Sequence, residues 1–160
     1  AVLAFFEERA GELDYASNLH PPSWPDGNDV EVMTWGALEA AWREAGRPHE
    51  REHTTPFVWD RPERFRVGNV RWPVGRDLSM SHRLTVDYPE DYALACALYE
   101  ALHRPGRAPF GLDEVLDLLA RRPELLALNA RLAGVNWYRH HLDELRTVGP
   151  EATRWPEVRA

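Results

Sequence analysis

Apolar and polar positions along the chain recur with two periods, one typical of strands and the other of helices. Alternation with a period of two predicts strands at 29–35 and 65–72, and we expect two further short strands at 13–19 and 83–87. Apolar positions three and four residues apart predict helices at 1–11, 35–45, 90–103, 112–120 and 123–132, with a short helix within 48–62. Strands and helices that alternate irregularly in this way indicate an α/β fold.

Residues at several predicted helix ends support these boundaries. Thr34 can cap the helix that follows it, and Gly46 stands where that helix should end. Pro89 and Pro123 each occupy a first helical turn, where the missing N–H of proline has no consequence.

Composition narrows the possible functions. The chain has 160 residues, a formal net charge of −7, a single cysteine and no lysine. One cysteine excludes a disulfide scaffold and a cysteine-built zinc module, and the absence of lysine excludes a Schiff base and a phosphate-loop lysine. No apolar run approaches the roughly 18 residues that a membrane span needs, and the acidic balance argues against nucleic-acid binding. With no basic leader before its first helix, we expect the protein to be cytoplasmic.

One motif has the spacing of a zinc peptidase. His49-Glu50-Arg51-Glu52-His53 matches H-E-x-x-H, which places two imidazoles on one face of a helix with a glutamate as general base. The two central residues are charged, however, and Pro48 and Pro56 leave little room for a long helix. We therefore interpret this segment as the polar start of a short helix that happens to contain two histidines.

Two other acidic segments are candidates for ligand binding. Residues 25–32 form an Asp-Gly turn that leads into a strand, and spacing alone favours an ordinary turn there, while the ligand alternation of a calcium loop is missing. Asp87 lies at the end of a predicted strand, just before a helix, where open α/β sheets bind ligands. Magnesium binding and a structural role are equally compatible with Asp87, whereas Glu90 and Asp91 suit the positive end of the helix dipole.

Taken in order, several segments resemble one family, the spore-coat polysaccharide cytidylyltransferases, which are related to enzymes that make CMP-linked acidic sugars. The resemblance covers residues 1–133. It rests on Asp14-Tyr15-Ala16-Ser17-Asn18, Pro25-Asp26-Gly27-Asn28-Asp29-Val30-Glu31-Val32, Leu38-Glu39-Ala40-Ala41-Trp42, Glu50-Arg51-Glu52-His53-Thr54-Thr55-Pro56, Pro62-Glu63-Arg64-Phe65 and Arg83-Leu84-Thr85-Val86-Asp87-Tyr88-Pro89-Glu90-Asp91-Tyr92.

The resemblance implies a Rossmann-like nucleotidyltransferase fold with a mixed sheet. It implies transfer of CMP from CTP to a sugar acid, with Mg²⁺ and release of pyrophosphate, for the synthesis of surface polysaccharide. Asp87 would be the metal ligand, with Asp87 and Arg83 as the catalytic pair. The residues expected on the substrate side are Asn18, Asp26, Asp29, Glu31, Arg51, Glu52 and His53.

Two departures from the family pattern change these expectations. Tyr88 stands where the family has a small capping residue, so the helix after Asp87 should lose its hydroxyl cap. The family's N-terminal half, with its arginine- and glycine-rich phosphate loop and a second magnesium ligand, has no counterpart here. We therefore expect a C-terminal, acceptor-side portion with an incomplete CTP site that is inactive alone.

Residues 134–160 lie outside the resemblance. They are rich in aromatic and charged residues, which makes a homodimer plausible. The alternative hypothesis is a non-catalytic interaction or dimerisation module derived from the same fold.

Overall fold

The computed structural model describes residues 1–73 and 75–156, which form two compact units. The first unit contains Ala1–Trp24, Asp29–Asp77 and Val135–Trp155. The second contains Pro25–Asn28 and Leu78–Gly134, together with Pro156. Each unit has an apolar core of its own. Within the described part of the chain, no helix has the length and apolar character needed to cross a bilayer.

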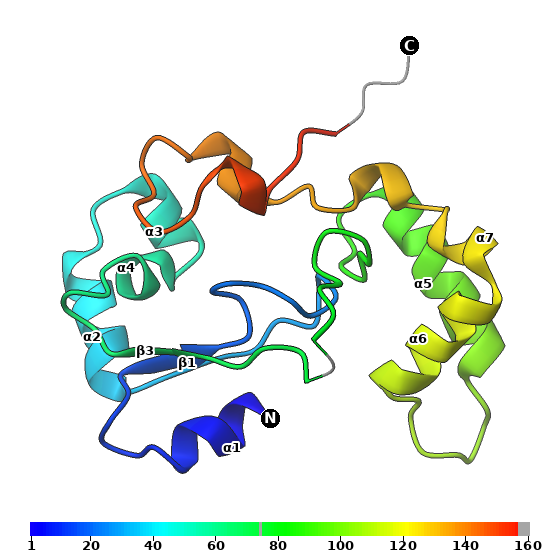
Figure 1. Ribbon diagram of the computed structural model, residues 1–160, viewed down its shortest axis with the longest axis horizontal. Helices are drawn as coiled ribbons and strands as arrows, with labels where there is room; N and C mark the ends of the chain where they lie inside the picture. The colour runs from blue at the N-terminus through cyan, green and yellow to red at the C-terminus, as the bar shows by residue number, and fades with distance from the viewer. Residues whose placement is uncertain (74, 157–160) are drawn as a thin grey trace. The chain divides into compact units, whose positions relative to one another are not determined.

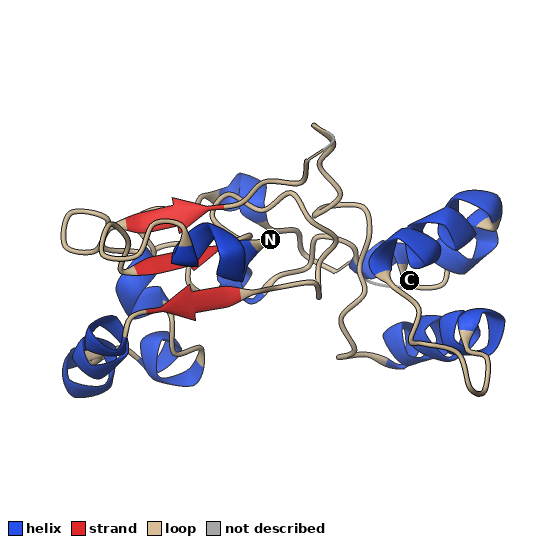
Figure 2. Ribbon diagram, turned by 90° about the horizontal axis from the view of Figure 1, so that it is seen from below, coloured by secondary structure: helices blue, strands red, loops and turns tan. Residues whose placement is uncertain are grey.

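The first unit is built on a mixed sheet of three strands in the order β2-β1-β3 (Figure 2). Its central strand β1 (Tyr15–Ser17) is antiparallel to β2 (Glu31–Met33) and parallel to β3 (Val67–Asn69). Every residue of β1 is buried, as expected for a strand that is paired on both sides. The predicted α/β class with a mixed sheet and flanking helices is confirmed.

Helices cover both faces of this sheet. Figure 1 shows α1 (Val2–Glu7) on one side of the strands and α4 (Pro56–Trp59) on the other. The approach of α1 requires glycine at position 68 of β3, because a Cβ there would come within 2.7 Å of the Phe5 ring. On the side of α4, Tyr15 packs with Phe57 and Phe65 in the first core.

The helices next to α4 begin largely where the sequence predicts. α2 (Trp35–Glu44) is capped by Thr34, whose hydroxyl accepts a 3.2 Å hydrogen bond from the Ala37 N–H. Ala37 and Ala41 are its buried residues, whereas Trp42 is 68% exposed. The predicted short helix within 48–62 is two helices, α3 (Pro48–Glu52) and α4.

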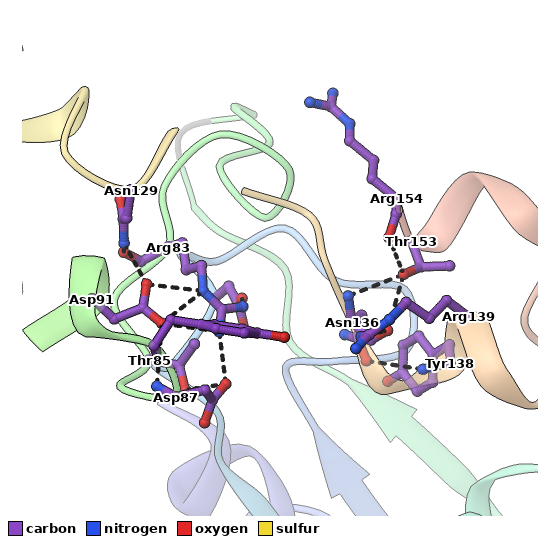
Figure 3. Close-up of polar contacts among 12 residues, drawn as sticks. Arg83, Thr85, Asp87, Asp91, Asn129, Asn136, Tyr138, Arg139, Thr153 and Arg154 are labelled. Carbon is purple, nitrogen blue, oxygen red and sulfur yellow. Dashed lines mark hydrogen bonds and ion pairs between the residues drawn. The ribbon is translucent and has the colours of Figure 1, made fainter. Parts of the chain in front are cut away.

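The segment 135–155 belongs to the first core. It contains the 3₁₀ helices η2 (Trp137–His140) and η3 (Pro150–Ala152), and it buries Tyr138 and Leu145 against the other core residues. The Thr153 hydroxyl bonds with the backbone N–H and C=O of Asn136 (Figure 3). The division into a family-like part, 1–133, and a tail, 134–160, stays a prediction, and the last four residues of that tail lie outside the described residues.

The second unit is helical. α5 (Pro89–Leu102), α6 (Leu112–Arg121) and α7 (Pro123–Leu126) bury a leucine-rich core, and η1 (Ala130–Leu132) follows. The single helix predicted at 123–132 was wrong, since α7 ends after one turn. Asn129 has left helical geometry, and its side chain donates instead to the Arg83 carbonyl and to Asp91.

The strand predicted at 83–87 was also wrong. Only one bridge forms, between Asp26 and Arg83, through the Leu84 N–H to the Asp26 carbonyl at 2.7 Å and the Asp26 N–H to the His82 carbonyl at 2.9 Å. Further along, the backbone N–H groups of Asp87 and Tyr88 donate to the Asp91 carboxylate. Because these two N–H groups bond to a side chain at the start of α5, they are not available to pair with a neighbouring strand.

Asp60 offers a test of how the 135–155 segment is held. Its carboxylate is 3% exposed, and its Oδ1 accepts hydrogen bonds from the backbone of Arg146 and Thr147 at 2.8 Å each and from the Thr147 hydroxyl at 2.9 Å. We predict that Asp60→Ala lowers the free energy of unfolding by about 2–3 kcal/mol, because it removes several hydrogen bonds to a buried, charged acceptor. Urea unfolding measures this loss. Asp143→Ala, at an exposed position of the same segment, is the control, and equal stability of the two variants would contradict the prediction.

Candidate functional site

A buried ion pair joins Arg83 and Asp91 in the second unit. The Arg83 Nε lies 3.1 Å from Asp91 Oδ1, and the two side chains are 2% and 0% exposed. Nε and Nη2 each also lie 3.2 Å from Asp91 Oδ2, so the guanidinium contacts both carboxylate oxygens. Contacts with both oxygens match the planar shape of a carboxylate, so they fix the relative orientation of the two groups in addition to pairing their charges.

Further hydrogen bonds to Asp91 stabilise the buried charge. The carboxylate accepts from Asn129 Nδ2 at 2.8 Å and from the backbone N–H groups of Asp87 and Tyr88 at 3.1 Å. Burial acts to raise the pKa of Asp91, but the hydrogen bonds from Arg83, Asn129 and Asp87 outweigh it and hold the pKa below its usual value. The same contacts cap α5 from within, and so replace the hydroxyl cap that Tyr88 cannot supply.

Arg83 also binds two further carboxylates. Its Nη2 lies 2.6 Å from Asp87 Oδ2, and its Nη1 lies 3.2 Å from Asp26 Oδ2. Figure 3 shows Arg83 with Asp87, Asp91 and Asn129 converging on it. Three carboxylates around one guanidinium leave a formal charge of −2. The side chain of Asp87 is 62% exposed, so this excess negative charge faces solvent there.

Asn129 fixes the orientation of this cluster. Its side chain is buried, and Nδ2 donates to the Arg83 carbonyl at 2.9 Å as well as to Asp91. Because both partners are acceptors, only the amide nitrogen can face them. Asn129 thus connects the turn after α7 to the backbone of Arg83.

A groove of about 270 Å³ lies beside the cluster. Its lining includes Gly27, Thr85 and Asp91 together with apolar side chains of α5 and α6. Gly27 has a φ of +94°, and a Cβ there would lie 2.5 Å from the Thr85 backbone nitrogen. The close approach of these two backbone segments therefore requires glycine. A groove with one polar wall and one apolar wall can bind a small molecule that has both characters.

The other predicted site residues lie in the first unit. Asn18 Oδ1 accepts the Val30 N–H at 2.8 Å, and Glu31 accepts the hydroxyl of buried Tyr15. Arg51 donates to the Trp42 carbonyl at 2.8 Å, and the His53 ring stacks on Trp137 at 4.0 Å. Asp29 and Glu52 are exposed.

The structure thus brings together Arg83, Asp87 and Asp26 from the predicted set. Sequence reasoning missed Asp91 and Asn129 as members of this cluster. Asp91 is the third residue of its helix, where a carboxylate can accept hydrogen bonds from the N-cap backbone. An aspartate at this position also suits the helix dipole when it is exposed, so its position alone does not predict the buried cluster. Nothing in the sequence marks Asn129.

One oxygen of the cluster fits a magnesium ion. Mg²⁺ prefers carboxylate oxygen and is commonly held by one or two carboxylates plus substrate phosphates. Asp87 Oδ2 accepts hydrogen bonds from Arg83 and Thr85, whereas its Oδ1 accepts none from the part of the chain that the structure describes, and the side chain is exposed. Asp91 does not fit, because buried donors occupy both of its oxygens.

Comparison with solved structures decides the fold. A cytidylyltransferase from Leptospira borgpetersenii superposes with a TM-score of 0.68 and 25% sequence identity, over 78% of this chain and 50% of that one. The chain has a cytidylyltransferase-like fold. An uncharacterized protein of Methanocaldococcus jannaschii is 29% identical over 108 residues, which is 66% of this chain and 42% of that protein. No protein-family model matches. The cytidylyltransferase-like chain thus spans half or less of the length of the proteins it matches.

The lowered pKa of Asp91 predicts acid sensitivity. A carboxylate with a depressed pKa in the folded state stabilises above its unfolded pKa of about 3.9, and that stability is lost as the pH falls through the folded value. We predict that Asp91→Asn, although less stable at neutral pH, loses less free energy of unfolding than the wild type between about pH 6 and about pH 3.

Urea unfolding at several pH values measures this difference. Other carboxylates with lowered pKa, such as Asp14 and Glu50, remain in both proteins and contribute equally. Asp117→Asn, at an exposed position of α6, is the matched control and should keep the acid sensitivity of the wild type. Parallel pH profiles for Asp91→Asn and the wild type would contradict the prediction.

Proposed function

We propose that this chain is part of a cytidylyltransferase that transfers CMP from CTP to an acidic sugar, for the synthesis of a surface polysaccharide or glycan. The observation that supports the proposal is the likeness to the Leptospira cytidylyltransferase, with a TM-score of 0.68 over 78% of the chain. Since the chain spans half of that protein, the CTP site of the whole enzyme would include residues beyond this sequence.

Within the proposed reaction, the chain's own residues hold a negatively charged binding position. Arg83 fixes the Asp87 carboxylate through Oδ2 and leaves Oδ1 directed away from that bond. Asp87 would hold Mg²⁺, which neutralises phosphate charge when it is bound. Asp91 and Asn129 act as positioning residues, because they fix Arg83 and with it Asp87.

An acceptor oxygen would form a bond to the α-phosphorus of CTP as the bond to pyrophosphate breaks. Positioning and charge neutralisation supply most of the rate in such transfers. The substrate side of the proposal retains Asn18, Asp26, Asp29, Glu31, Arg51, Glu52 and His53.

A cytoplasmic location and a homodimer complete the proposal. CTP is available in the cytoplasm, which is why the reaction would take place there. Exposed aromatic side chains support a contact between subunits, since Trp35 and Trp42 of α2 are 76% and 68% exposed.

The first functional prediction concerns pyrophosphate. We expect the full-length gene product, given CTP, Mg²⁺ and a panel of nonulosonic and uronic acids, to release pyrophosphate and form a CMP-sugar with at least one acceptor. A coupled pyrophosphate assay and mass spectrometry measure both products. Release at background with every acceptor would contradict the proposal, and calorimetry that finds no CTP binding by the same protein would favour a non-catalytic module.

The second functional prediction concerns Asp87. We predict that Asp87→Asn abolishes magnesium-dependent activity while it changes stability by less than about 1 kcal/mol, because its side chain is 62% exposed. Activity and melting temperature are measured on the same preparations, with Asp117→Asn as the control. A large loss of stability with retained activity would instead make Asp87 a structural residue.

A further inference from the structure

The first unit brings together two histidines and a glutamate that are far apart in the sequence. His49 lies on α3, His141 directly follows η2, and Glu144 is three residues further along. His141 Nδ1 lies 3.1 Å from Glu144 Oε1, and His49 Nδ1 lies 3.5 Å from Glu144 Oε2. One ligand atom from each of the three residues lies within 4.8 Å of the other two.

His49 carries a second, independent sign of a ligand. Its side chain is only 1% exposed, yet its Nδ1 has no hydrogen-bond partner among the residues that the structure describes. A buried polar atom without a partner costs about 1–3 kcal/mol. This nitrogen lies 3.5 Å from the same Glu144 carboxylate that His141 contacts.

We propose that His49, His141 and Glu144 bind a zinc-class divalent cation. Imidazole nitrogen and carboxylate oxygen are the donors that Zn²⁺ takes, and tetrahedral coordination places ligand atoms about 3.3 Å apart. His141 Nδ1 lies 3.1 Å from Glu144 Oε1 and His49 Nδ1 lies 3.5 Å from Glu144 Oε2, so each imidazole nitrogen is at about this distance from one of the two carboxylate oxygens. The ion would supply the partner that His49 Nδ1 lacks.

The surroundings of the three residues favour a fixed site. The Arg47 guanidinium donates to the Glu144 backbone carbonyl at 2.6 Å, which fixes the backbone of this residue without using its carboxylate. The His49 ring stacks beside Trp137, with ring centroids 6.1 Å apart. Bound metal would therefore link α3 to the 137–145 segment.

This site differs from a zinc peptidase although it contains the first histidine of the H-E-x-x-H motif. The second histidine, His53, stacks on Trp137 and is not one of the three ligands. Glu50, the general base of such enzymes, instead accepts hydrogen bonds from the backbone of Gly46 and Arg47 and from the Arg61 guanidinium. The proposed ion is structural, and its presence is independent of CMP transfer.

Calorimetry with ZnCl₂ on chelator-stripped protein without a histidine tag tests the site. We expect one equivalent to bind and to raise the melting temperature, since an ion that binds the folded state stabilises it. His141→Ala and Glu144→Gln should weaken binding by more than the roughly 10- to 100-fold that loss of an outer-shell partner costs. These two positions are chosen because His49 is buried and its replacement could unfold the chain.

Exposed neighbours supply the controls. His140→Ala and Asp143→Asn should bind zinc as the wild type does. In long-range ¹H–¹⁵N spectra, the ring nitrogens of His49 and His141 should shift on zinc addition while those of His53 do not. Absence of stoichiometric binding, or equal weakening by the control substitutions, would overturn the proposal.

Discussion

The ion pair between Arg83 and Asp91 is the constraint on which the second unit depends. Two charges with almost no exposure are costly to bury, and a lone contact between them would not offset that cost. The Asp91 carboxylate is stabilised because it also accepts from Asn129 and from two backbone N–H groups. Those same bonds begin α5 and hold the turn that follows α7. One carboxylate thereby determines a helix start, a loop position and the orientation of Arg83.

The ion pair with Asp91 still allows the Nη1 and Nη2 atoms of Arg83 to contact further carboxylates. Arg83 uses Nη1 and Nη2 for Asp26 and Asp87, whose carboxylates are more exposed than that of Asp91. The exposed edge of the cluster is therefore negative although its centre is a cation. This distribution of charge would allow Asp87 to hold the proposed divalent cation while it keeps its contact with Arg83. The arginine holds one oxygen, and the second stays available to solvent.

Local chemistry made much of the fold predictable, while contacts between distant segments did not. The Thr34 cap, the prolines that begin helices and the alternation at 29–35 depend on neighbours in sequence, and the corresponding elements are present. The strand at 83–87 failed because the carboxylate of Asp91 takes the backbone donors of Asp87 and Tyr88. An acid in a first helical turn has the same sequence signature when it is exposed and when it is buried beneath an arginine. Asp26 is far from Arg83 and Asp87 in the sequence, and the backbone bridge between Asp26 and Arg83 brings the three residues together.

The H-E-x-x-H segment is a second case in which the spacing of residues in the sequence does not give their contacts in the folded chain. Its spacing is typical of two histidines that bind one metal ion, although the charged residues between them favoured a polar helix start. In the structure α3 ends at Glu52, and the His53 ring stacks on Trp137. The fold instead supplies His141 and Glu144 from a segment some 90 residues away and sets them against the buried ring nitrogen of His49. If the proposed site binds metal, the H-E-x-x-H motif contains one of its three ligands, and the other two come from a distant part of the chain. Only the unpartnered nitrogen, a property of the folded chain, indicates which histidine of the motif would be the ligand.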